Sequence, residues 1–331
     1  MITRQIAVAL FSMSALVALI LLGPLVYYAT HHWRRSEMAV LNPVTVAEVT
    51  RGMPLPRNPP GPATGSVSTT LDCPRLPRQL VLDCRWHVSH TGGWCGPPDR
   101  RSRMLVGAVA ARGGMHAAMD QEGQDAVGTA WDPATGRLLT VVADGLGSLP
   151  DSGVVAVNAV QAALYLWAKR TGEEPLHELG DLLFRRVAQG LEASFGAGVA
   201  QRGGTTLVAA ELVPDEGGAT VTVQGVGDSE AWLLAGDEWE PVHHERPAGF
   251  DGNDNATRDL PGDPRPRTWT GRVPHGGLLL LATDGFAGRM ASGRSNEWMR
   301  RPLTPADLAR EIIDVEDTYS DDSGVVAVWV D

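Results

Sequence analysis

The sequence contains little cysteine. Its 331 residues include three, Cys73, Cys84 and Cys95, and none of them belongs to a Cys-x-x-Cys pair. An odd number argues against a framework in which every cysteine forms a disulfide, and the spacing matches no zinc-binding pattern. We therefore interpret the three cysteines as thiols in a linker.

Positive charge is scarce in the larger, C-terminal part of the chain. Residues 104–331 contain 17 basic and 34 acidic side chains, which gives a net charge of −17. Because nucleic acids are polyanions, so acidic a region is not expected to bind them. The same region has enough carboxylates to bind hard divalent cations.

Charge is absent close to the N-terminus. No charged residue occurs over 5–30, and residues 6–28 are almost wholly apolar. About 20 such residues cross a bilayer as a helix, whereas the apolar core of a signal peptide is ~7–15 residues long. We therefore predict a tail over 1–5 and a transmembrane helix over 6–28 in the lipid bilayer, with a cleaved signal peptide as the alternative. Positive charge is greater after this helix than before it, which predicts a single-pass membrane protein with a cytoplasmic C-terminal side.

Proline marks the segment that follows. Residues 36–103 hold ten of the 23 prolines, which predicts an extended linker. Within it, the run RQLVLDCRWHV is compatible with one short strand. The pattern changes at Met104, so we assign residues 104–331 to the folded domain.

The pattern of this domain predicts strands and helices that do not alternate regularly. We expect helices over 151–170, 175–195 and 305–317, and a polar loop over 243–272. The order of strands, two helices, many strands, one helix and a last strand indicates an α+β fold with mainly antiparallel sheets covered by helices. Several strands are apolar on both faces, as expected where a sheet packs between a second sheet and helices.

Acidic residues stand at the ends of these apolar strands. They are Asp125, Asp144, Asp228, Asp284 and the pair Asp321 and Asp322. Each one alone is most simply part of a turn. If the strands share one sandwich, however, the carboxylates gather at one edge, and they cannot stay ionised without counter-charge. Two Mg²⁺ or Mn²⁺ ions would supply that charge, and ions ~3.5–4 Å apart can activate a shared water for attack on phosphorus.

Five blocks in a fixed order make the pattern more specific. They are VVADGLG, GGTTLVAAEL, VQGVGDSEAWLLAGDEWEPV, LLLATDGFAG and DDSGVVAVWV, and GGMHAAMDQEGQDAVG precedes them. The five blocks resemble those of the PPM/PP2C family of metal-dependent serine/threonine protein phosphatases. The opening segment resembles that of a bacterial branch of the family, and the resemblance covers about residues 104–331.

The resemblance implies both a fold and a metal centre. The fold is an αββα sandwich of two mainly antiparallel β-sheets flanked by helices. Carried over residue by residue, Asp144 would bridge two Mn²⁺ or Mg²⁺ ions. The Gly145 carbonyl, Asp284 and Asp321 would complete the protein ligands.

Other residues of the motifs are implied in further roles. Asp125 matches the first-block aspartate, which acts through metal-bound water. Asp228 and the segment 204–206 match positions that hold the sheet edge and its turns. His116 could donate a proton to the leaving group, because imidazole titrates near neutrality, and a bystander histidine is the alternative.

The sequence departs from the family pattern at positions that matter for chemistry. Asp120 replaces the first-block arginine that would bind the substrate phosphate, and Arg112 or His116 could substitute for it. In the last block Asp322 stands where asparagine is common. This leaves open whether Asp321 or Asp322 is the metal ligand.

We therefore predict an enzyme that hydrolyses phosphoserine or phosphothreonine on proteins with a water activated by two metal ions. The alternative is a catalytically silent domain of the same fold, tethered to the membrane as a regulatory binding module. The retained Asp144, Asp284 and Asp321 favour activity, whereas the missing arginine favours the silent domain.

Overall fold

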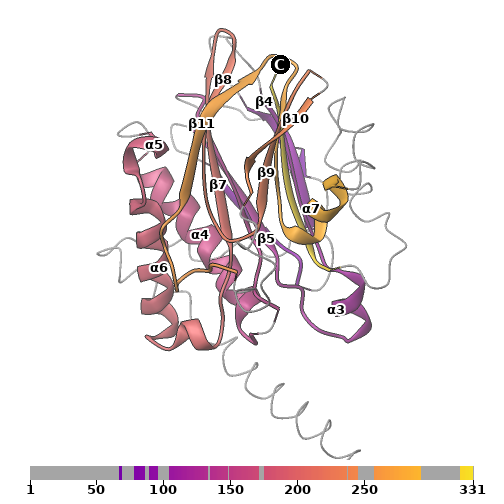
Figure 1. Cartoon of the computed structure of the whole chain (residues 1–331), viewed down its shortest axis with the longest axis vertical. Coiled ribbons are helices and arrows are strands. Elements are labelled where there is room, and N and C mark those ends of the chain that lie inside the picture. The colour runs from indigo at the N-terminus through magenta and orange to yellow at the C-terminus, as the bar shows by residue number, and fades with distance from the viewer. Residues whose placement is uncertain are drawn as a thin grey trace, which may run out of the picture.

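The computed structural model of the chain describes residues 67–68, 78–85, 89–95, 104–132, 135–147, 149–170, 175–236, 238–244, 257–291 and 321–330. In these ranges two β-sheets pack face to face, and helices cover both outer faces (Figure 1). The predicted transmembrane helix over 6–28 and the predicted helix over 305–317 lie outside the described residues. Within the described ranges, no helix has both the length and the apolar character that a membrane span needs.

One sheet has six strands, and all of its neighbouring strands are antiparallel. Their order is β11 (Arg267–Pro274), β8 (Gly218–Val226), β7 (Leu207–Asp215), β6 (Leu138–Ala143), β5 (Ala126–Trp131) and β2 (Arg78–Asp83). Helix α4 (Ser152–Arg170) crosses this sheet over β5 and β6, and α6 (Leu182–Phe195) packs on α4. Gly128 of β5 permits the close crossing, because a Cβ there would lie 2.5 Å from the side chain of Val160.

The other sheet has seven strands and is antiparallel except where β1 pairs with β3. Their order is β1 (Val67–Ser68), β3 (Ser89–Cys95), β4 (Met104–Ala111), β13 (Ser323–Val330), β12 (Leu278–Ala282), β9 (Glu230–Ala235) and β10 (Glu238–His243). Helix α7 (Asp284–Ala291) contacts β12 and β13 on its outer face. The predicted pair of antiparallel sheets with flanking helices is therefore confirmed.

The apolar run of β12 shows why strands of this domain are hydrophobic on both faces. Leu279 and Leu281 belong to the core between the sheets, whereas Leu278 and Leu280 belong to the cluster under α7. Successive side chains of a strand point to opposite faces, so a strand buried on both sides loses the usual apolar–polar alternation.

Part of the predicted linker belongs to the sandwich. The single strand expected there is β2, which pairs with β5 along its whole length, and a second strand, β3, pairs with β4. Leu82 and Cys84 lie in the core between the sheets. The interpretation of Cys84 as a linker thiol is therefore wrong. Prolines before and after this stretch gave it the composition of a linker, although six residues suffice for an edge strand.

Two expected elements also differ from the structure. The predicted helix over 175–195 is divided into α5 (Leu176–Leu179) and α6, because Gly180 between them has a φ of 55°. The predicted loop over 243–272 includes the first part of β11. That edge strand is mostly exposed or half-exposed, so it lacks the apolar pattern by which a strand is recognised.

Candidate metal centre

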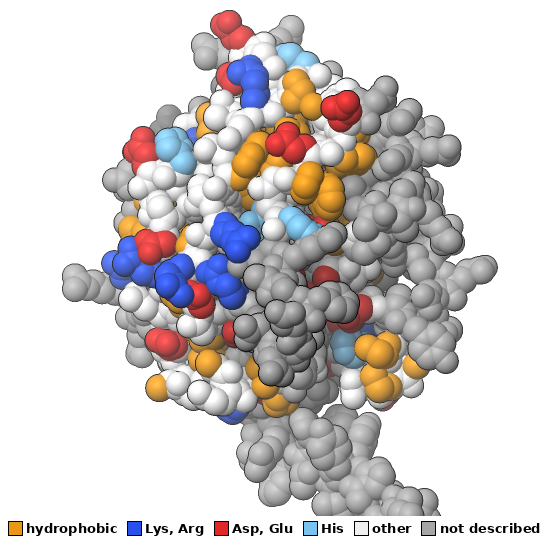
Figure 2. All heavy atoms as spheres, in the orientation of Figure 1, with side chains coloured by type: hydrophobic (Ala, Val, Ile, Leu, Met, Phe, Trp, Pro, Cys, Tyr) orange, Lys and Arg blue, Asp and Glu red, His pale blue; other side chains and the backbone are white. Residues whose placement is uncertain are grey.

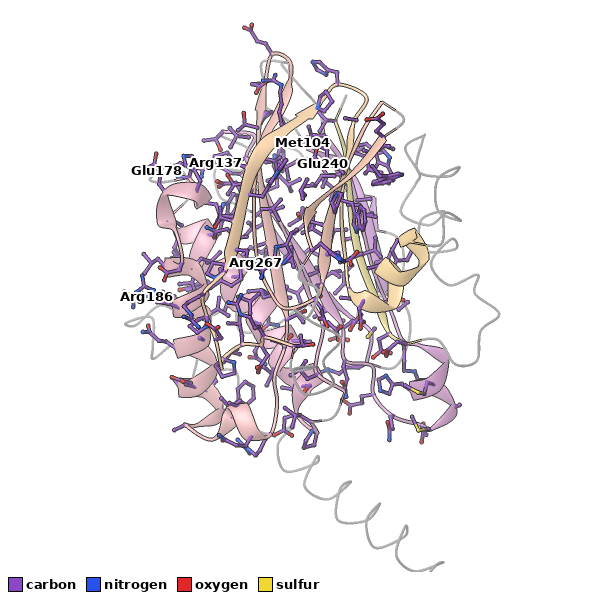
Figure 3. The ribbon with its side chains drawn as sticks, in the orientation of Figure 1. Met104, Arg137, Glu178, Arg186, Glu240 and Arg267 are labelled. Carbon is purple, nitrogen blue, oxygen red and sulfur yellow. The ribbon has the colours of Figure 1, made fainter. Side chains whose placement is uncertain are left out.

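A pocket of about 140 Å³ opens at one end of the sandwich. Met104, at the start of β4, is labelled near the upper end in Figure 3; the pocket lies at the other end, where β4 leads into α3 (Gly114–Ala118). The lining includes the four residues expected to bind metal and two further predicted residues. These six are Asp144, Gly145, Asp284, Asp321, His116 and Asp228.

Asp144 is held by its backbone at the end of β6. Its N–H donates to Thr206 Oγ1 at 3.0 Å. Its carbonyl accepts the Thr206 N–H and the Thr205 hydroxyl, both at 2.8 Å. The Thr206 hydroxyl is also 2.7 Å from that of Ser229, which precedes β9. The threonine pair thus fixes the backbone of Asp144 and leaves its carboxylate for the pocket.

Two glycines let separate segments approach this carboxylate. A Cβ on Gly285 would lie 1.9 Å from the Asp322 carbonyl oxygen, so the first turn of α7 touches the backbone just before β13. This contact brings Asp284 and Asp321 to the same pocket. A Cβ on Gly145 would lie 2.8 Å from backbone atoms of Ser152, where α4 begins.

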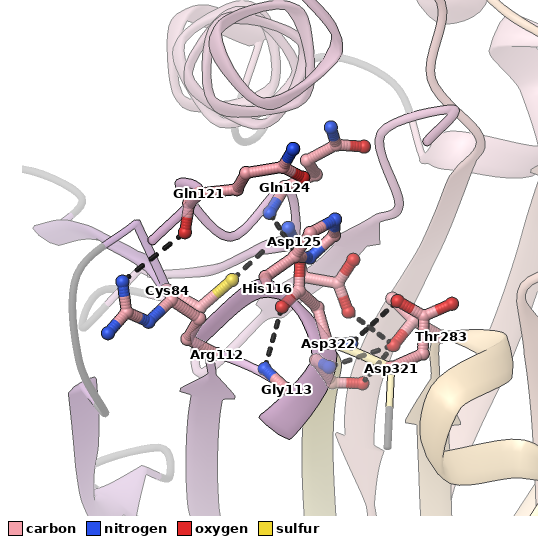
Figure 4. A network of polar contacts seen from close by, with 11 residues as sticks. Cys84, Arg112, Gly113, His116, Gln121, Gln124, Asp125, Thr283, Asp321 and Asp322 are labelled. Carbon is pink, nitrogen blue, oxygen red and sulfur yellow. Dashed lines mark hydrogen bonds and ion pairs between the residues drawn. The ribbon is translucent and has the colours of Figure 1, made fainter. Parts of the chain in front are cut away.

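Asp322 is buried and fully engaged with neighbouring groups, as Figure 4 shows. Its Oδ1 accepts the Gly113 N–H at 2.7 Å, and its Oδ2 accepts the Gln124 N–H at 2.6 Å and lies 2.8 Å from His116 Nδ1. Asp321 is exposed in the pocket, and its Oδ1 accepts the Asp322 N–H at 2.8 Å. Potential ligand atoms of His116, Asp321 and Asp322 lie within 4.8 Å of one another, but those of Asp322 already have partners. The geometry therefore favours Asp321 over Asp322 as a ligand.

His116 is a buried residue of α3 that faces the pocket. Its hydrogen bond to Asp322 raises the pKa of the imidazole above its ordinary value, although burial acts in the opposite direction. Because Nδ1 is engaged by Asp322, Nε2 is the ring nitrogen that remains for a substrate.

Asp125 lies beneath the pocket, 3% exposed, at the start of β5. Its Oδ2 accepts the Thr283 hydroxyl at 2.7 Å, which links the two sheets at this end. Burial and the charge of Asp322 raise the pKa of Asp125 well above its usual range. The residue supports the pocket from below and is not part of its lining.

The carboxylates of this cluster are destabilised by burial and by one another. Burial, together with the charges of Asp125 and Asp284, raises the pKa of Asp144 well above its usual range. Burial also raises the pKa of Asp284. A divalent cation would reverse this cost, since it favours the ionised form of every carboxylate around it.

The donor set fits hard cations. Carboxylates of Asp144, Asp284 and Asp321 and a backbone carbonyl at Gly145 are oxygen donors, which suit Mg²⁺ and Mn²⁺. All four residues line the pocket, so ions bound there would be accessible from solvent. The residues present therefore fit the pair of ions that the sequence resemblance implies.

The family's phosphate-binding arginine has no direct replacement among the described residues of the pocket. Asp120, at the expected position, is exposed with a φ of 52°. Arg112 donates from Nη1 to the Gln121 carbonyl at 3.2 Å (Figure 4). Among the described residues that line the pocket there is no arginine or lysine. On the face shown in Figure 2 basic side chains gather elsewhere, over α6 and β11, where Arg186 and Arg267 lie (Figure 3).

Sequence reasoning missed several residues that shape the site. Gln124 lines the pocket, and its Oε1 is buried with no hydrogen-bond partner among the described residues. Thr283 bridges Asp125 and the backbone of Gly324. Thr257 lines the pocket and donates to Asp228 at 2.8 Å. The position of Gln124 directly before Asp125 was a usable signal; the other contacts join residues distant in the chain.

Comparison with known proteins agrees with this geometry. The profile of the family described as protein phosphatase 2C matches residues 112–316, which is more than half of the chain. The chain belongs to the protein phosphatase 2C family. A comparison with curated proteins gives no match.

Solved structures share the fold of this protein phosphatase 2C domain. A serine/threonine phosphatase of S. agalactiae matches with a TM-score of 0.55 at 18% identity, covering 69% of this chain and 100% of that one. The catalytic domain of the phosphatase PstP, in complex with two manganese ions, matches with a TM-score of 0.50 at 21% identity, covering 69% and 99%. At these identities the likeness concerns the fold.

Proposed function

We propose that this chain is a metal-dependent phosphatase that hydrolyses phosphoserine and phosphothreonine on proteins. The observation that carries the proposal is the meeting of Asp144, Asp284 and Asp321 in one pocket. Because these acids come from three separate strand ends, a turn or cap explains each one singly but not their convergence. Membership of the protein phosphatase 2C family supports the same reaction.

Two Mn²⁺ or Mg²⁺ ions would be held by Asp144, the Gly145 carbonyl, Asp284 and Asp321. When bound, they would supply Lewis acidity at phosphorus and lower the pKa of the attacking water. The chain itself would keep the ligands in place. The threonine hydrogen bonds hold the backbone of Asp144, and the close contact at Gly285 joins the other two carboxylates.

His116 would move the proton that the leaving group needs. Its raised pKa favours the imidazolium, and the bond from Nδ1 to Asp322 fixes the ring. From Nε2 it would donate to the departing serine or threonine oxygen. In the protonated form it would also attract the substrate phosphate. The described lining residues include no arginine or lysine that could do so. Asp125 would act from beneath the ligands, as an acceptor for water.

One observation favours a second function, a catalytically silent binding module. The pocket lining has no arginine or lysine among its described residues, and the family's phosphate-binding arginine is replaced by Asp120. A domain that binds metal but holds phosphate too weakly for turnover could act as a regulatory binding module without hydrolysing a substrate. This function and hydrolysis share the metal site and differ only in turnover.

The test is phosphate release from phosphoserine and phosphothreonine peptides by the full chain, with and without Mn²⁺. We expect Mn²⁺-dependent release by the wild type and none by Asp144→Ala. The matched control is Asp215→Ala, which removes an aspartate at the other end of β7, where it pairs with Arg272. Equal release by the wild type and Asp144→Ala would contradict the proposal. Mn²⁺ binding without turnover would support the silent module.

A further inference from the structure

A segment outside the family match lies against the metal centre. The match to protein phosphatase 2C begins at residue 112, whereas β2 spans Arg78–Asp83 and forms an edge of the six-stranded sheet. Its last residue, Asp83, pairs with Ala126, the first residue of β5. The next two residues, Cys84 and Arg85, therefore run alongside the loop that carries Gln124 and Asp125.

Three hydrogen bonds join this segment to that loop. The Cys84 N–H donates to the Asp125 carbonyl at 3.2 Å, and the Asp125 N–H donates to Cys84 Sγ at 3.3 Å. The Gly123 N–H donates to the Arg85 carbonyl at 2.9 Å. Cys84 thus contacts both polar groups of the Asp125 backbone, and the sulfur serves as an acceptor (Figure 4).

Cys84 and the loop at Gly123 are closely packed against each other. Cys84 has no exposed surface and belongs with Leu82 to the core between the sheets. A Cβ on Gly123 would lie 2.6 Å from both the Cys84 carbonyl oxygen and its Sγ. The loop therefore closes on the cysteine so tightly that a side chain at Gly123 would force one of the two segments to move.

The loop is held from its other side by groups of the metal centre. The Gln124 N–H donates to Asp322, which also holds His116, and the Asp125 carboxylate accepts the Thr283 hydroxyl. A shift of the Asp125 backbone would therefore move its carboxyl group, which acts electrostatically on Asp144, and disturb the hydrogen bonds around His116. Partners that hydrogen-bond directly to a metal ligand commonly change metal affinity by ~10–100-fold when removed, and Cys84 acts one residue further from the ligands.

We propose that Cys84 is a positioning residue of the metal centre, and that residues 78–85 are a working part of the phosphatase domain that its family profile leaves out. For its effect on hydrolysis the proposal rests on the proposed function. Its effects on the loop and on metal affinity do not require turnover. The cysteine acts as a neutral, buried acceptor for the Asp125 N–H and not as a nucleophile.

The test compares three variants of the full chain with the wild type. Cys84→Ala removes the acceptor, and Cys84→Ser replaces the sulfur by an oxygen that can accept the same N–H. The control Val330→Ala truncates a residue of the same core cluster at the opposite end of β13. The readouts are hydrogen exchange of a peptide spanning residues 121–126 without metal, and Mn²⁺ affinity by calorimetry.

We expect Cys84→Ala to speed exchange in this peptide and to weaken Mn²⁺ binding measurably, by about tenfold at most. Cys84→Ser should restore most of the protection from exchange and most of the Mn²⁺ affinity. Val330→Ala should change neither the exchange of this peptide nor the Mn²⁺ affinity, although it lowers overall stability. Wild-type exchange and affinity in Cys84→Ala, or equal losses in Val330→Ala, would overturn the proposal. A wild type that binds Mn²⁺ but releases no phosphate would overturn the proposed hydrolysis and not the positioning role.

Discussion

Buried acids in two regions of this domain have opposite surroundings: Glu211 in the six-stranded sheet, and the aspartates of the metal centre. Glu211 of β7 is 2% exposed and accepts hydrogen bonds from Arg137, the Trp167 indole N–H at 2.7 Å and the Leu176 N–H at 2.6 Å. Its charge is therefore matched inside the protein. For Asp125 and Asp144, by contrast, burial and the charges of neighbouring carboxylates raise the pKa values.

The contrast distinguishes an acid that stabilises the fold from acids that need a bound cation to offset their charge. A buried carboxylate with a guanidinium and two N–H donors is satisfied, and it joins β7 to the last part of α4 and to the first residue of α5. A cluster of carboxylates without such partners is costly unless a cation from outside neutralises it. The difference lies in the partners of each acid and not in its burial.

The largest effect should come from removing the satisfied acid. Glu211→Ala removes the carboxylate that pairs with the buried guanidinium of Arg137, so we expect a loss of about 3–5 kcal/mol in the free energy of unfolding by urea. Glu211→Gln, which keeps the shape and one acceptor, should lose less. If Glu211→Ala were as stable as the wild type, the role of Glu211 in holding the fold would be wrong.

Removing an acid of the metal centre should have the opposite effect on stability. Without metal at neutral pH, Asp144→Asn should melt at or above the Tm of the wild type, because a charge that burial and its neighbours disfavour is gone. With Mn²⁺ at 100 times its Kd, the wild type should gain about 2.7 kcal/mol and the variant much less. Thermal melts in chelator and in Mn²⁺ measure both. A lower metal-free Tm for Asp144→Asn would contradict the contrast between the two groups.

A smaller effect should appear in the titration of His116. Its pKa in the metal-free protein should exceed the ordinary value of about 6.5, because Asp322 and, more weakly, Asp321 favour the imidazolium while Arg112 opposes it. The stability that this ion pair contributes is then complete below about pH 6.5 and is lost as the pH rises through the folded-state pKa.

Asp322→Asn is the variant that checks this titration. It should lower the pKa of His116, followed by NMR of the ring protons with assignment from His116→Gln. An unchanged pKa in Asp322→Asn would show that Asp322 is not the group that holds the proton on His116.

Sequence alone predicted the sandwich and the set of acids, because both depend on local signals. An apolar run such as that of β12 is enough to predict a strand, and the Asp-Gly pairs after β6 and β12 mark the ends of strands. The choice between Asp321 and Asp322 could not be made from the sequence. It depends on which carboxylate meets Gly113, Gln124 and His116, and these contacts span about two hundred residues.

The contribution of the segment before Met104 also could not be predicted. Its composition, with prolines on both sides of β2, is that of a linker, and one short edge strand has no periodic signal strong enough to offset this. That Cys84 contacts Asp125 is a consequence of the β2–β5 register, in which Asp83 lies opposite Ala126. Such pairing is a tertiary property, and a cysteine count could not reveal it.

The central claim is that acids from three strand ends form one site for divalent cations. Crystals of the full chain grown with Mn²⁺ test it directly, through anomalous scattering at the manganese edge. The claim predicts two manganese peaks bounded by Asp144, the Gly145 carbonyl, Asp284 and Asp321. A pocket without manganese at a saturating concentration, or manganese bound only at other carboxylates, would contradict it.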